Sequence, residues 1–156
     1  MCIAGVQIPR CLLFSGCVVP HVQEDLESGT RACAAGGVTS FFDMPNTVPN
    51  TIDRATMAAK KELAARKCMV NYNFFIGATP DNLEEINAVE NVPGIKIFMA
   101  ASTGSLLVSE HAAVENIFAN GDRLIAIHSE DEATIQANRE TYADSTDVMD
   151  HMRIRS

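Results

Sequence analysis

The sequence predicts an α/β fold in which a parallel sheet is covered by helices. Short apolar runs alternate with segments of helical periodicity at intervals of roughly 20–30 residues, which gives about five strand–helix units. The predicted strands are uniformly apolar, as is typical of parallel strands that are covered on both faces. The chain has 156 residues, enough to bury one substantial core. Two architectures remain open, a doubly wound open sheet and part of a (β/α) barrel.

The composition is that of a soluble globular protein, with 47% hydrophobic and 21% charged residues. A net charge of −8 argues against nucleic acids and anionic membranes as partners. No apolar run approaches the ~20 residues of a membrane span, and residues 1–10 lack the features of a signal peptide. The five cysteines form no Cys-x-x-Cys pair, so we expect reduced core cysteines and a cytoplasmic location.

The elements follow one another in a regular order along the chain. Residues 1–15 have no clear assignment, because Pro9 and Arg10 are a poor lead-in to the apolar residues 11–14. The predicted strands are residues 17–19, 38–43, 70–76, 95–99 and 124–127, and the predicted helices are residues 25–35, 53–66, 79–89, 110–119 and 130–140. Residues 141–156 are predicted to form a polar tail.

Capping residues mark several of the helix boundaries. We expect Gly36-Gly37 to end the first helix, Thr79 or Asp81 to begin the third, Ser109 to begin the fourth and Gly121 to end it. No Gly-x-Gly-x-x-Gly follows the first strand and no Walker lysine loop occurs, so a nucleotide site has no support in the sequence.

Lys96 lies in the middle of an apolar strand and needs an explanation. A charged amine in such a strand must pair with an anion, lose its proton or be chemically modified, because an isolated buried charge is costly. The structural alternative is a lysine whose stem lies along the core while its amine reaches a strand end.

Polar side chains gather near the predicted strand ends, where parallel α/β folds place their function. These residues are His21, Asp43, Asn46, Thr79, Asp81, Lys96, Ser102, Thr103, His128, Glu130 and Asp131. Imidazole and carboxylate groups are good ligands for a zinc-like ion, and a lysine carrying CO2 as a carbamate would become an anionic ligand. Taken singly, each residue also has a structural explanation, such as a turn histidine or a turn-capping aspartate.

Several motifs resemble those of the cyclic amidohydrolases, and within them the dihydroorotases. They are residues 25–32, 35–39, 43–47, 73–79, 94–98, 102–104, 128–132 and 151–155, and the resemblance spans about residues 12–156. The resemblance implies the metal-dependent hydrolase fold, a (β/α) TIM-type barrel, here a partial barrel of about five strand–helix units. It also implies reversible hydrolysis of dihydroorotate to carbamoyl-aspartate in pyrimidine biosynthesis, with one or two zinc ions.

The resemblance assigns roles to four residues. His21, Lys96 and His128 match metal ligands, and Lys96 sits where many relatives carry the carbamylated bridging lysine, so it is also the expected catalytic residue. Asn46 matches the asparagine that contacts the substrate carboxylate. Hydantoinases and allantoinases share the lysine and the later histidine, so they stay open as alternatives.

The chain also departs from the family pattern. Gln23 stands where a second histidine is expected, and the arginine expected soon after it is absent. We assign residues 1–15 to an uncertain remnant of an N-terminal segment and residues 16–156 to the partial barrel. From these departures we expect impaired activity and an incomplete metal site. The alternative is a non-catalytic homologue that acts by association. In either case, we expect a homo-oligomer or a partner chain to cover the open sheet edges.

Overall fold

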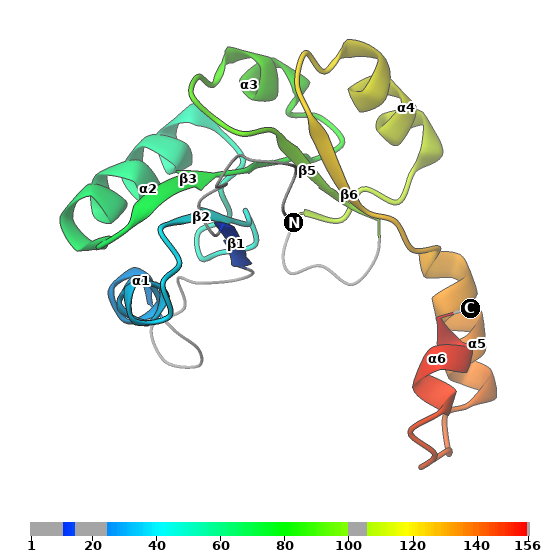
Figure 1. Ribbon diagram of the computed structural model, residues 1–156. Helices are drawn as coiled ribbons and strands as arrows, with labels where there is room; N and C mark the ends of the chain where they lie inside the picture. The colour runs from blue at the N-terminus through cyan, green and yellow to red at the C-terminus, as the bar shows by residue number, and fades with distance from the viewer. Residues whose placement is uncertain (1–10, 15–24, 100–105, 156) are drawn as a thin grey trace, which may run out of the picture.

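The computed structural model describes residues 11–14, 25–99 and 106–155. The elements run in the order β1 (Cys11–Phe14), α1 (Leu26–Ala35), β2 (Ser40–Asp43), α2 (Arg54–Lys67), β3 (Asn71–Phe74), β4 (Ile76–Gly77), α3 (Leu83–Ala88), β5 (Ile95–Phe98), α4 (His111–Asn120), β6 (Ile125–His128), α5 (Glu132–Thr141) and α6 (Asp150–Ile154). Figure 1 shows α1 to α4 arranged in chain order around the outside of a curved row of strands. The predicted parallel α/β fold is therefore present.

The strands form two three-stranded parallel sheets, β1-β2-β3 and β4-β5-β6. Only Phe75 separates β3 from β4. The Phe75 N–H donates to the Asp43 carbonyl at 3.1 Å, and the Ala78 N–H donates to the Lys96 carbonyl at 2.9 Å. One continuous segment therefore pairs with β2 on one side and β5 on the other, so all the strands lie in chain order in a single row.

The hydrophobic core lies between the strands and the outer helices. It contains Phe41, Phe74, Ile76, Ile95 and Ile97 from the strands, together with Leu26, Met57, Ala64, Ile86 and Ile117 from α1 to α4. Alternate strand residues point the other way, because successive side chains of a strand project to opposite faces. Lys96 and Phe98 lie on that opposite face of β5.

Local sequence signals explain where the first two helices begin. Asp25 and Asp53 are the N-caps of α1 and α2, and each carboxylate accepts a hydrogen bond from the backbone N–H three residues later. Gly36 closes α1 as predicted, and Gly37 follows with a φ of +71°, in the left-handed region that favours glycine.

Two predicted caps are wrong. Asn82, not Thr79 or Asp81, precedes α3, and its side chain makes no capping bond. Its amide instead donates to the carbonyls of Ile52 and Gly77 and so ties two loops together. Glu110, not Ser109, precedes α4, whereas Gly121 ends that helix as predicted.

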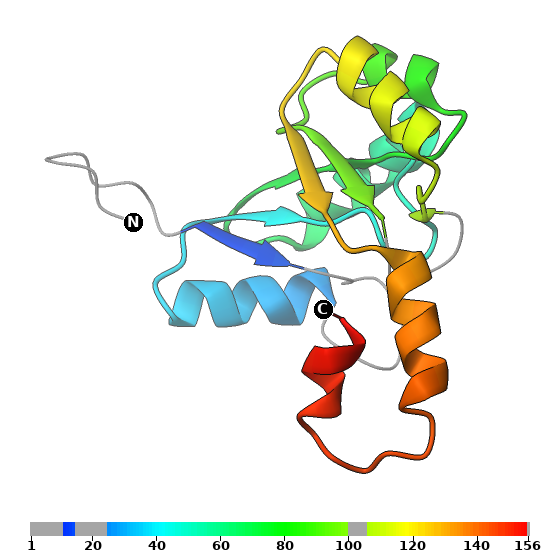
Figure 2. The same cartoon turned by 90° about the vertical axis from the view of Figure 1, so that its right-hand side faces the viewer.

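The ends of the chain also differ from expectation. The strand predicted at residues 17–19 lies outside the described residues. Cys11–Phe14, which had no clear assignment, form β1 and pair with β2 from Cys11 opposite Ser40 to Phe14 opposite Asp43. The division at residue 15 stays a prediction. The polar tail contains the short helix α6, which packs beside α5 away from the strands (Figure 2). None of the helices within the described ranges is long and apolar enough to cross a membrane.

A buried ion pair joins the sheet to helix α2. The Lys60 ammonium lies 2.8 Å from an Asp43 carboxylate oxygen, and both side chains are almost fully buried. Lys60 also donates to the Met44 carbonyl at 3.0 Å and lies 4.7 Å from the centre of the Phe74 ring. Burial raises the pKa of Asp43, and the adjacent ammonium opposes this rise. The pair fixes the end of β2 against α2.

Breaking this pair from one side should be strongly destabilising. We expect Asp43→Ala to lower the free energy of unfolding by about 3–5 kcal/mol, because the Lys60 charge would remain buried without its carboxylate. Urea unfolding measures the change. Glu62→Ala is the matched control, since it breaks the exposed Arg66–Glu62 pair of the same helix and should have little effect. Equal effects of the two variants would contradict a structural role for the buried pair.

Candidate active site

The carboxyl ends of the parallel strands meet at one edge of the row, as the register requires. Asp43 ends β2, Phe98 ends β5 and His128 ends β6, with Phe98 directly opposite His128. An open cavity of about 610 Å³ lies beyond the ends of β5 and β6. It is lined by Met99, Ser109, His111, Ser129, Glu130, Asp131, Glu132, Ala133 and Gln136. This cavity lies at the edge of the row where the sequence analysis expects the site residues.

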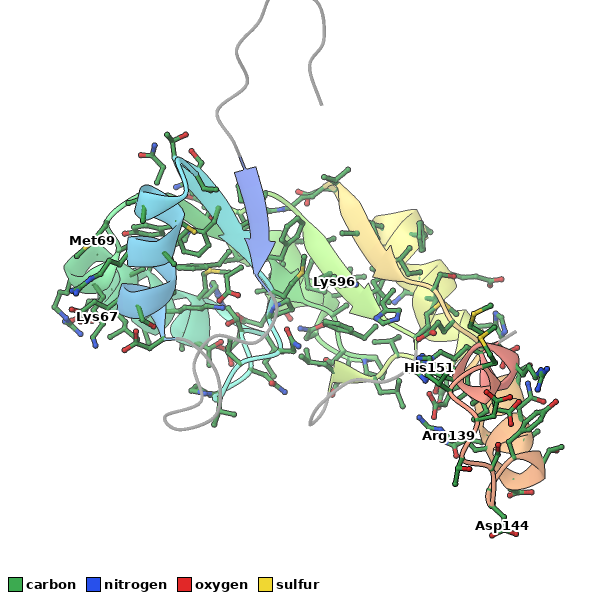
Figure 3. The ribbon with its side chains drawn as sticks, turned by 60° about the horizontal axis from the view of Figure 1, so that its bottom comes forward. Lys67, Met69, Lys96, Arg139, Asp144 and His151 are labelled. Carbon is green, nitrogen blue, oxygen red and sulfur yellow. The ribbon has the colours of Figure 1, made fainter. Side chains whose placement is uncertain are left out.

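Lys96 is buried in the middle of β5 (Figure 3), with only 7% of the residue exposed. Its ammonium donates to the Ile97 carbonyl at 3.0 Å and lies 4.2 Å from the centre of the Phe98 ring. Among the described residues no carboxylate forms an ion pair with it, and burial lowers its pKa. A lowered pKa makes the neutral amine, which is the nucleophilic form, easier to reach.

His128 projects from the same face as Lys96. Because Lys96 lies opposite Ala126 and Phe98 opposite His128, the lysine and the histidine are diagonal neighbours on adjacent strands. The rings of Phe98 and His128 lie 6.2 Å apart, centre to centre. The structure thus brings together two of the three predicted metal ligands.

Glu130 and Arg155 extend this arrangement. The His128 Nε2 atom lies 2.8 Å from one carboxylate oxygen of Glu130, and the Arg155 guanidinium is bonded to the other. The hydrogen bond from Arg155 is the main reason that the pKa of Glu130 is lowered. Sequence reasoning placed Glu130 at the strand end without a role and gave Arg155 none. The only signal for Arg155 was its place in the motif of residues 151–155.

The other predicted site residues either lie away from Lys96 and His128 in the chain's fold or fall outside the described residues. Asn46 is half-buried in the loop after β2. That loop packs closely on Gly77, where an added Cβ would lie 3.0 Å from the Cβ of Pro45 and 2.6 Å from a Leu106 methyl group. His21, Ser102 and Thr103 lie outside the described residues. Asp43, expected among the strand-end ligands, is instead engaged by Lys60 on the helix side.

The donor set in the described ranges is small. No group of three or more histidine, cysteine, aspartate or glutamate residues is placed there to hold a metal ion. His128 fits a ligand role, because its carboxylate partner resembles the outer partners that orient metal-binding histidines. Lys96 fits only as its carbamate, since an ammonium would repel a cation. These two residues can supply part of a metal site.

Comparison with known proteins shows which class of protein the chain resembles. No family model matches the chain. It is 38% identical over 118 residues to a dihydroorotase from Methanosarcina mazei, which covers 71% of this chain and 25% of the relative. It is 34% identical over 116 residues to a dihydroorotase from Pyrococcus furiosus, and this match covers 73% of this chain and 25% of the relative. An allantoinase from Bacillus velezensis is 32% identical over 155 residues, and this match covers 88% of this chain and 34% of the allantoinase.

Solved structures give the same class. The L-hydantoinase (dihydropyrimidinase) of Arthrobacter aurescens matches with a TM-score of 0.75 and 27% identity, over 84% of this chain and 31% of that one. A dihydroorotase from Saccharomyces cerevisiae shares the fold at a TM-score of 0.59 and 18% identity. The match covers 86% of this chain and 44% of the dihydroorotase.

By sequence and by fold, the chain is a homologue of the cyclic amidohydrolases. Within this class it is dihydroorotase-like, as the motifs predicted. It spans about a quarter to a third of the length of the curated relatives named above.

The buried amine predicts a rise of stability with pH. The pKa of Lys96 lies below its ordinary value of 10.5 in the folded protein. Between the two pKa values the unfolded chain binds more protons, so stability increases as the pH rises through this window. The urea midpoint, measured in CO2-free buffer from pH 7 to 10.5, should rise in the wild type and much less in Lys96→Met. Lys67→Met, a more exposed lysine, should keep the wild-type rise. Parallel curves for wild type and Lys96→Met would contradict the prediction.

Proposed function

We propose that this chain carries part of the active site of a metal-dependent hydrolase of cyclic amides. The proposed substrates are dihydroorotate and carbamoyl-aspartate in pyrimidine biosynthesis. One observation carries the proposal: the buried Lys96 in the middle of β5 and the partly exposed His128 at the end of β6 share one face of adjacent parallel strands. The similarity to dihydroorotases supports the choice of substrate, while the allantoinase and hydantoinase relatives make those substrates the alternatives.

We propose that the row of strands is a partial (β/α) barrel. The strands follow one another in chain order, all parallel, and α1 to α4 lie outside them (Figure 1). In such a barrel the face that carries Lys96 and Phe98 is the interior, and the strand ends form the catalytic mouth. The edge of β6 would then need a neighbour, from a second copy of the chain or from a partner.

In this proposal each of the predicted site residues has a separate role. The neutral Lys96 nitrogen attacks the carbon of CO2, forms an N–C bond and loses a proton, which leaves an anionic carbamate. The carbamate, His128 and His21 would hold one or two zinc ions, and Asn46 would bind the substrate carboxylate. When bound, zinc lowers the pKa of a water molecule and polarises an amide carbonyl. A cytoplasmic location agrees with the free thiol of Cys68.

A second candidate function is association without catalysis. Gln23 replaces a family histidine, and the described ranges contain no group of three metal-binding side chains. Such a chain would act by binding a partner protein. Stable co-elution with that partner, without zinc, is its signature.

Carbamylation gives a direct test of the role of Lys96. We expect one carbamate resonance in the carbon NMR spectrum after addition of 13C-bicarbonate, because burial favours the neutral amine. The resonance should be absent from Lys96→Arg, which keeps a positive charge but cannot form the carbamate, and present in Lys67→Arg. A spectrum without the wild-type resonance would remove Lys96 from the ligand set.

Hydrolysis by the zinc-loaded chain tests the function itself. Dihydroorotate, allantoin and hydantoin are assayed in parallel, with the carbamoyl product measured. We expect dihydroorotate to be turned over fastest, at a low rate, and His128→Ala to lose at least about tenfold of this rate through weaker metal binding. Turnover of none of the three substrates would favour the non-catalytic function.

A further inference from the structure

We propose that copies of this chain associate head to tail, with the free edge of β6 in one copy paired to the free edge of β1 in another. The added strand would run parallel to β6 and extend the row in the order that it already has. This inference goes beyond the proposed function, because it concerns a surface between copies and needs neither metal nor substrate.

The first observation is that β6 has backbone groups that face the open end of the row. The His128 carbonyl accepts a hydrogen bond from the Met99 N–H of the β5 side, at 3.0 Å. Successive residues of a parallel strand direct their N–H and C=O groups to alternate sides. The N–H and C=O groups of Ile125 and Ile127 therefore point away from β5, to an edge where none of the described strands pairs with them.

The second observation is the matching edge of β1 at the other end of the row. The Phe75 N–H donates to the Asp43 carbonyl at 3.1 Å, so Asp43 and every second residue before it face β3. The residues between them face β1, and the register of Leu12 opposite Phe41 makes Leu12 their bonding partner. The N–H of Leu13 therefore points away from β2, and within the described ranges β1 has no second strand beside it.

Apolar side chains beside β6 are exposed in the way expected where a neighbouring unit is missing. Ile97 of β5 and Ile127 of β6 lie opposite each other, yet Ile97 is fully buried and Ile127 is 38% exposed. Leu124, directly before β6, is 66% exposed, and Phe118 of α4 is 52% exposed. A strand added beside β6, with the helix that follows it, would extend the cover over this surface.

A second copy fits the direction of the row. Every described strand lies parallel to its neighbour, and α1 to α4 lie outside the row (Figure 1). Because β1 is followed in the chain by α1, a second copy supplies the next strand and its helix in the same order. The edges of β6 and β1 are therefore complementary surfaces of one chain.

The charges of the two ends favour contact between unlike ends. Residues 25–71, which contain α1, β2 and α2, carry six basic and five acidic side chains. Residues 106–155, which contain α4, β6, α5 and α6, carry four basic and ten acidic side chains. Pairing β6 with the β6 of a second copy would bring two acidic ends together, whereas pairing β6 with β1 brings an acidic end to a weakly basic one.

Two edge variants and their mixture test this contact. Ile127→Pro removes the N–H at the free edge of β6, and Leu13→Pro removes the N–H at the free edge of β1. In each variant the bonds to the adjoining strand of the same copy are kept. In sedimentation velocity we expect the wild type to have at least twice the mass of one chain and each variant alone to be a monomer. An equal mixture of the two variants should form a dimer, because each copy then supplies the edge that the other has lost.

Controls keep the test decisive if proline disturbs the fold. Circular dichroism checks each variant, and Ile127→Lys with Leu13→Lys replaces a pair that does not fold, since a charge on an edge strand also opposes pairing. Val48→Lys, at a residue 63% exposed in the loop after β2, should keep the wild-type mass. A monomeric wild type would overturn the proposal. So would folded variants that stay monomeric when mixed, or a Leu13→Pro variant that dimerises alone through β6.

Discussion

The segment from Asn71 to Ala78 is the constraint on which the rest of the structure depends. It pairs with β2 through the Phe75 N–H and with β5 through the Ala78 N–H, so it joins the two three-stranded sheets. Without this junction the strand ends would have no common edge. The loop that carries Asn46 and the strand that carries His128 come from different sheets, and this segment sets their spacing.

Two buried lysines show how the surroundings decide the role of a residue. Lys60 lies on helix α2, points toward the strands and meets the Asp43 carboxylate, so its charge is paired and its role is structural. Lys96 projects from the opposite side of the strands and, among the described residues, meets a backbone carbonyl and an aromatic ring. Within the described part of the chain, these weaker contacts are the ones that compensate its charge. The lysine without a carboxylate is therefore the one suited to chemistry.

The candidate site was predictable in part from the sequence. Lys96 and His128 were recognisable because each stands in or after a short apolar strand, where a polar side chain is costly unless it has a purpose. Asp43 met the same criterion, but its partner is a lysine of α2, and no local pattern shows which face a strand-end residue will take. Arg155 was not predictable, since it reaches Glu130 only through the packing of α6 on α5.

The sequence by itself determined the class of the fold, the order of its elements and most of the helix boundaries. These follow from apolar periodicity and from caps such as Asp25 and Gly121, which act over a few residues. Only the tertiary structure decided that Cys11–Phe14 join the sheet, that Asp43 turns to Lys60 and that Arg155 anchors the partner of His128. The physical reason is range: hydrogen bonds and ion pairs between residues far apart in the chain form only when packing brings them together.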